Sequence, residues 1–132
     1  MPRTKSRTLT NLELAIMQIV WNDGEVMVED ISQMLEKEGH PLALPSIRTM
    51  LSILQGKGYV KRRKVGRGHA YKAVIPQEKA QKNIIKDIVD RAFEGSAMNL
   101  VATLLDTRMV SEKELSRVKN MIRKYEKKAG KK

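Results

Sequence analysis

Hydrophobic residues near the start of the chain recur every three or four positions, which is the spacing of one face of an α-helix. This stripe begins at a capping box formed by Thr10 and Glu13, a pair whose side chains satisfy free amides at a helix start. It ends at the turn-forming residues Asn22, Asp23 and Gly24. We therefore expect a first helix whose inward side carries Leu12, Ala15, Ile16, Ile19 and Val20.

Two more helices and a hairpin follow this first helix. A second helix is expected over residues 28–38, with Gly39 as its C-terminal stop. Pro45 falls in the first turn of a third helix, where its missing amide costs nothing. Residues 59–65 and 70–73 then carry strand-forming side chains, and they flank a glycine-rich tip that consists of Gly66, Arg67, Gly68 and His69.

The third predicted helix has one apolar and one polar face. With Ile47 at the centre of the apolar face and about 100° per residue, the other apolar residues fall within about 60° of it: Met50, Leu51 and Leu54. The opposite arc holds small residues and one arginine: Pro45, Arg48, Thr49 and Ser52. Arg48 suits guanine O6 and N7, and the two hydroxyls suit a base edge or a phosphate. The alternative is that Arg48 is a solvated charge, but its place in a helix-turn-helix favours DNA.

After Pro76 the remaining pattern is helical, with Ser96 as one helix cap and Ser111 with Glu114 as a second capping box. These helices make up about 55 residues, which is near the lower limit for burying a core alone. Their apolar stripes are more easily covered by a second copy. We expect a dimerisation domain over residues 76–132, after a DNA-binding domain over residues 1–75. Its candidate interface residues are Ile84, Ile88, Phe93, Leu100, Leu104, Leu115, Val118 and Ile122.

Charge indicates what the first domain binds. The chain carries a formal net charge of +11, and residues 57–72 contain seven Lys or Arg and no acid. This balance favours a polyanionic partner. Alternate residues of a strand point to opposite faces, so the basic residues of the first hairpin strand divide into two sets, Lys61 with Arg63 and Arg62 with Lys64. We expect one set, together with Arg67 at the tip, to meet phosphate.

Several other classes of function are disfavoured. The chain has no cysteine, and its only histidines, His40 and His69, have no carboxylate pattern beside them, so we expect no metal, no cofactor and no enzyme activity. Aromatic residues are too scarce for a platform that stacks single-stranded bases. No apolar run approaches the roughly 20 residues of a membrane span, so we expect a cytoplasmic protein without membrane insertion.

The fold class predicted from these patterns is mainly α: a winged helix-turn-helix of three helices and a short β-hairpin wing, followed by a helical dimerisation module. Two further functions stay open. A non-specific architectural protein associated with DNA or RNA fits the charge equally well. A protein-interaction adaptor is also conceivable, although the acid-free basic hairpin argues against it.

The chain resembles the BlaI/MecI/CopY family of penicillinase and copper repressors. The resemblance is carried by residues 9–21, 41–75 and 92–106 and covers about residues 9–125. It implies a homodimeric repressor in which each winged helix binds half of a palindromic operator in double-stranded DNA. By matching position, Ser46, Arg48 and Thr49 would lie in the recognition helix, and Arg67, Gly68 and His69 in the wing. The candidate DNA contacts are then Pro45, Ser46, Arg48, Thr49, Ser52, Arg62, Arg63, Lys64, Arg67 and His69.

Two features of the family are not matched. The beta-lactamase repressors are cleaved at an Asn–Phe pair in the dimerisation region, and the corresponding place here holds Thr103 and Leu104. Copper-responsive members carry a C-terminal cysteine cluster, whereas this chain has no cysteine. The resemblance therefore assigns neither an inducing signal nor a regulatory protease or sensor.

Overall fold

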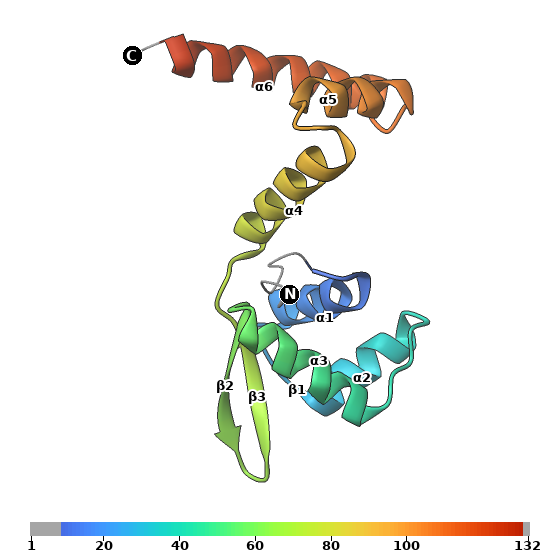
Figure 1. Cartoon of the computed structure of the whole chain (residues 1–132), viewed down its shortest axis with the longest axis vertical. Helices are drawn as coiled ribbons and strands as arrows, with labels where there is room; N and C mark the ends of the chain where they lie inside the picture. The colour runs from blue at the N-terminus through green and yellow to red at the C-terminus, as the bar shows by residue number, and fades with distance from the viewer. Residues whose placement is uncertain (1–8, 131–132) are drawn as a thin grey trace, which may run out of the picture. The chain divides into compact units, whose positions relative to one another are not determined.

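The protein is mainly helical, as its pattern predicted. The computed structural model describes residues 9–130 (Figure 1). The elements run in the order α1 (Asn11–Asp23), β1 (Glu25–Met27), α2 (Val28–Lys37), α3 (Leu44–Gly56), β2 (Val60–Val65), β3 (Gly68–Ala73), α4 (Gln77–Ala92), α5 (Ala97–Asp106) and α6 (Glu112–Gly130). None of the helices within residues 9–130 combines the length and the apolar character needed to cross a bilayer.

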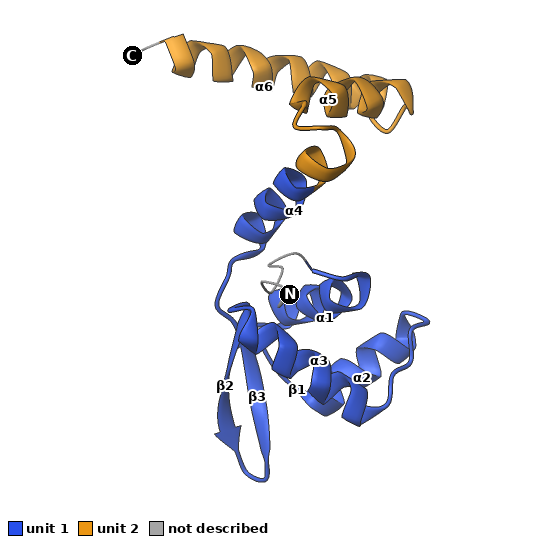
Figure 2. Cartoon of the chain, viewed as in Figure 1, with its two compact units in different colours: residues 1–87 blue, residues 88–132 orange. Residues whose placement is uncertain are grey.

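The chain divides into two compact units, residues 1–87 and residues 88–132 (Figure 2). The division falls inside α4, beyond the expected domain boundary between residues 75 and 76. The first unit includes the start of α4 because Ala80 is fully buried and belongs to the same core cluster as α1, α2 and α3.

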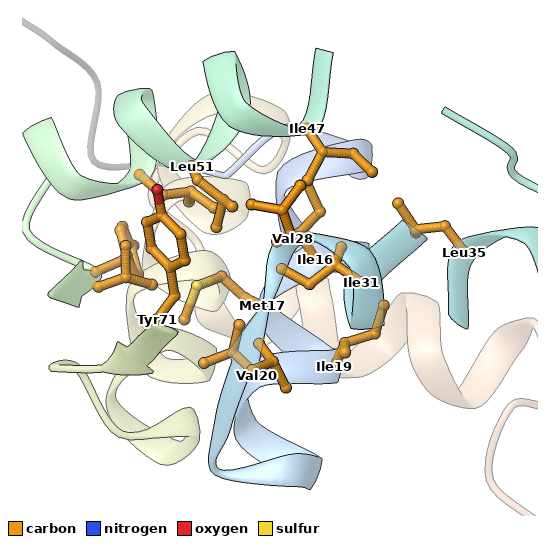
Figure 3. Close-up of a cluster of buried hydrophobic side chains, with 14 of the residues drawn as sticks. Ile16, Met17, Ile19, Val20, Val28, Ile31, Leu35, Ile47, Leu51 and Tyr71 are labelled. Atoms are coloured by element: carbon orange, nitrogen blue, oxygen red, sulfur yellow. The ribbon is translucent and has the colours of Figure 1, made fainter. Parts of the chain in front are cut away.

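The core of the first unit joins the inward faces of α1, α2 and α3 to the sheet (Figure 3). Of the predicted inward residues of α3, Ile47, Leu51 and Leu54 are fully buried, and Met50 is half-buried and packs against the core. On α1 the prediction was wrong at Leu12, which is 38% exposed, while Met17 is fully buried instead. Leu12 lies in the first turn of the helix, at the end of the packed face, and the buried face further along is wide enough to include both Ile16 and Met17.

The hairpin belongs to a three-stranded antiparallel sheet with the order β1-β3-β2. The first strand, β1, was not predicted, and it pairs with β3 through Glu25↔Lys72, Val26↔Tyr71 and Met27↔Ala70. The hairpin loop is also shorter than predicted, because Val65 pairs with Gly68 and the strand includes His69. Only Gly66 and Arg67 remain in the loop, and Gly66 has a φ of +59°, as the first position of a type II′ turn requires.

The second unit consists of the end of α4, α5 and α6. Ser96 caps α5, and Ser111 with Glu114 forms the predicted box at the start of α6, with N···O distances of 3.1 and 3.2 Å. None of the residues of α5 and α6 that the structure describes is buried. The large apolar side chains left exposed in this unit are Met98, Val101, Leu105, Met109, Met121, Ile122 and Tyr125.

The predicted dimerisation residues are half-buried or exposed within the single chain. Ile122 is 53% exposed. The other seven are half-buried, namely Ile84, Ile88, Phe93, Leu100, Leu104, Leu115 and Val118. Thr103 and Leu104, which were expected at the place of the cleavage pair, lie within α5, where the Thr103 hydroxyl donates to the Asn99 carbonyl at 2.8 Å.

Candidate nucleic-acid interface

A groove of about 750 Å³ lies between the start of α2, the helix α3 and the hairpin. Arginines from three different elements line it: Arg48 from α3, Arg62 from β2 and Arg67 from the hairpin loop. The wall also includes His69 and Tyr71 of β3. The fold therefore brings the predicted reading helix and part of the basic hairpin to one concave surface, although 14 to 19 residues separate Arg48 from the other two arginines.

The predicted outer arc of α3 is exposed. Its residues Pro45, Arg48, Thr49 and Ser52 all lie on the surface of the first unit, and so does Ser46, which the family resemblance added to the candidate contacts. The hydroxyl of Thr49 donates to the Pro45 carbonyl at 3.0 Å, so its proton is used within the helix and its lone pairs face outward as acceptors. This small, polar surface allows a close approach to a base edge, with Arg48 as its one long cationic side chain.

The register of the sheet decides which basic residues share the groove face. Arg62 stands opposite Tyr71, and Tyr71 stands opposite Val26; both of these partners are buried. Arg62 and, two residues on, Lys64 therefore project from the face of the sheet that covers the core and borders the groove. Lys61 and Arg63 project from the opposite face.

Arg63 is already bound within the protein. Its Nε donates to Oε2 of Glu25 at 2.9 Å and its Nη2 donates to Oε1 at 2.8 Å, which is a two-pronged pair. Ala70 of β3 stands between β1 and β2 at this point of the register, and its small side chain lets the arginine reach across the strand. The hydrogen bond from Arg63 lowers the pKa of the Glu25 carboxyl. The acid that pairs with this residue was missed because β1 was not predicted.

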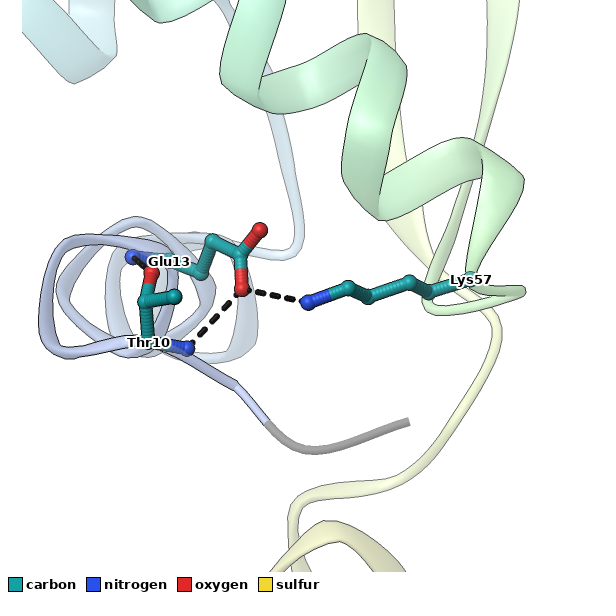
Figure 4. A network of polar contacts seen from close by, with 3 residues as sticks. All are labelled: Thr10, Glu13 and Lys57. Atoms are coloured by element: carbon teal, nitrogen blue, oxygen red, sulfur yellow. Dashed lines mark hydrogen bonds and ion pairs between the residues drawn. The ribbon is translucent and has the colours of Figure 1, made fainter. Parts of the chain in front are cut away.

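Lys57 is also used inside the protein. Its Nζ lies 2.7 Å from Oε1 of Glu13, and the two side chains are only 10% and 4% exposed (Figure 4). The same Glu13 oxygen accepts from the Thr10 amide at 2.9 Å, as the predicted capping box requires. Burial alone would raise the pKa of Glu13, but the hydrogen bonds from Lys57 and Thr10 together lower it. Lys57 thus joins the end of α3 to the start of α1.

A helix-turn-helix whose second helix exposes an arginine, followed by a basic hairpin beside the same groove, defines a winged-helix DNA-binding protein. The family model of the penicillinase repressors matches residues 9–124. The chain belongs to this family, whose members are DNA-binding transcriptional repressors and not enzymes. The family resemblance inferred from the sequence is confirmed.

A curated relative agrees with this assignment, and two solved structures share the fold. The methicillin resistance regulatory protein MecI of Staphylococcus aureus is 20% identical over 122 residues, which cover 91% of this chain and 97% of MecI. RosR of H. salinarum matches with a TM-score of 0.51 at 16% identity, covering 88% of this chain and 92% of RosR. A mutant of E. coli MarR, solved with operator DNA, matches with a TM-score of 0.50 at 16% identity, covering 89% of this chain and 75% of MarR. The two structures show that the fold is shared.

Proposed function

We propose that this repressor acts as a homodimer that binds a palindromic operator in double-stranded DNA and blocks transcription by occupying it in the cytoplasm. The observation that carries the proposal is the single groove that Arg48, Arg62 and Arg67 line beside the exposed arc of α3. In this arrangement α3 lies in the major groove, where Arg48 reads a guanine. Arg62, Lys64 and Arg67 neutralise phosphates beside it. His69, Pro45, Ser46, Thr49 and Ser52 complete the contact surface.

Arg63 has a different part in this proposal from the one expected from sequence. Its guanidinium is paired with Glu25, and neither residue lines the groove. It therefore stabilises the attachment of β2 to the rest of the sheet, and the phosphate contacts come from the opposite face. The pair lies at the surface, so it holds the Arg63 side chain in place but adds little to the free energy of unfolding.

The proposal is tested by selecting duplexes from a random pool with the full chain and then titrating the selected and random duplexes over a range of salt. We expect a short palindromic consensus, and a steep fall in affinity as salt rises. If the pool yields no consensus, or if the selected and random duplexes bind with equal affinity, the proposal is contradicted and a non-specific architectural protein is favoured.

The two faces of the hairpin strand can be compared with a matched pair of substitutions. Lys64→Ala and Lys61→Ala each remove one exposed lysine from β2, but from opposite faces. We expect Lys64→Ala to reduce the slope of log affinity against log salt by about 0.9, the loss of one phosphate contact, and Lys61→Ala to leave the slope unchanged. Fluorescence anisotropy at several salt concentrations measures both slopes. An equal reduction of the slope in both variants would contradict the assignment of the Lys64 face, and not the Lys61 face, to the DNA contact.

Dimerisation is proposed from the exposed apolar side chains of α5 and α6. A second copy would cover them and set two winged helices at a fixed spacing, as a palindrome requires. We expect Ile122→Glu to yield monomers at concentrations where the wild type is dimeric, because it places a charge in the apolar contact. Asn120→Glu adds the same charge at a neighbouring exposed polar position of α6 and should leave the dimer intact. Sedimentation velocity separates the two outcomes, and a wild type that sediments as a monomer would refute the dimer.

A further inference from the structure

One acidic side chain lies in the groove proposed to bind DNA. Among the described residues that line it, Glu29 carries the only carboxylate, and it shares the wall with Arg48, Arg62 and Arg67. Glu29 is exposed and is the second residue of α2. A carboxylate is an unexpected residue on a surface that accepts a polyanion, because it repels every phosphate that approaches.

Three other acids of the first unit have structural partners. Glu13 binds Lys57, Glu25 binds Arg63, and Asp30 accepts a hydrogen bond from the Met27 amide at 3.0 Å at the start of α2. Capping of α2 is therefore done by Asp30. For Glu29 the structural alternative is the favourable effect of any negative charge in the first turn of a helix, and that effect does not depend on DNA.

We infer that Glu29 is a specificity-determining residue, which penalises duplexes that do not place a base amino group within reach of its carboxylate. This inference rests on the proposed function. A carboxylate accepts a hydrogen bond from cytosine N4 or adenine N6, and this gain offsets the repulsion from nearby phosphates. On a duplex that places a guanine or thymine acceptor, or only backbone, opposite Glu29, the repulsion is not offset. Specificity then has two sources: the Glu29 charge disfavours duplexes of other sequence, and Arg48 favours the operator.

The test compares Glu29→Gln with Glu36→Gln in the full chain, on the selected operator and on a random duplex. Both substitutions remove one exposed carboxylate from α2, and Glu36 lies about two turns further along the helix, roughly 10 Å from Glu29. We expect Glu29→Gln to raise the affinity for random duplex about threefold to tenfold and to raise operator affinity less, so that the specificity ratio falls at least about threefold. Glu36→Gln should change neither affinity.

Two further measurements separate this role from a purely structural one. The gain of Glu29→Gln on random duplex should shrink as salt screens the charge, and Glu29→Asp, which keeps the charge, should keep the low affinity for random duplex. The inference is overturned if Glu29→Gln shifts both duplexes by the same factor, or if Glu36→Gln has the same effect. A wild type that does not distinguish operator from random duplex would instead refute the proposed function.

Discussion

Replacing Arg48 with alanine is expected to weaken binding to the selected operator by about 1–3 kcal/mol, which is roughly 5- to 150-fold in affinity. Arg48 is the one long cationic side chain on the exposed arc of α3, and it lines the groove together with the hairpin arginines. Its loss removes a two-pronged hydrogen bond to a guanine, so the variant should also accept other bases at one position of each half-site. Competition titrations against operators with a single altered base pair measure both effects.

Arg67→Ala is the control for this prediction, because it removes an equal charge from the same groove. Arg67 lies in the hairpin loop, where it meets phosphate in the proposed complex. This variant should weaken all duplexes by about the same factor and leave the base preferences unchanged. If Arg48→Ala behaved in the same way, the arginine of α3 would be a phosphate contact and its role in base reading would be disproved.

The second large effect concerns folding. Lys57→Met should lower the free energy of unfolding by about 3 kcal/mol at neutral pH, because it leaves the buried Glu13 carboxylate without its ammonium partner. Lys61→Met, which removes an exposed lysine, should change it by less than about 0.5 kcal/mol. Urea unfolding followed by circular dichroism measures both. Equal stabilities of the two variants would show that the pair between α1 and α3 does not support the fold.

The same pair makes stability depend on pH in a direction set by Glu13. Its pKa is lowered in the folded protein from an ordinary value of 4.5, so the folded state favours the charged carboxylate. The stabilisation is fully present above pH 4.5 and is lost as the pH falls through the lowered pKa. The difference between the wild type and Lys57→Met should therefore shrink on acidification, and unfolding curves between neutral and acidic pH would show it.

The helices could be predicted because their signals are local. Thr10 with Glu13 and Ser111 with Glu114 each lie within one turn, and both form the expected hydrogen bonds. Likewise, the angular position of Ile47 was enough to find the exposed arc of α3. These features depend on residues that are close in sequence, and no tertiary contact overrides them.

The features that could not be predicted depend on pairing between distant segments. The strand β1 is only three residues long, too short for an alternating pattern, and it forms because β3 offers it a free edge. Without β1, the acid that pairs with Arg63 could not be identified. The hairpin pattern separated Arg62 and Lys64 from Lys61 and Arg63, but the burial of Tyr71 and Val26 decided which set faces the groove.

The tryptophan at the end of α1 has one further consequence. Trp21 is the only tryptophan in the chain, and its Nε1 donates to the Ile75 carbonyl at 2.9 Å, two residues before α4 begins. The segment that leads from the sheet into α4 is therefore attached to α1 through the ring of a fluorophore. A rearrangement of this segment that breaks the hydrogen bond would change the solvation of that indole, so the protein contains its own optical probe for the segment that leads into α4.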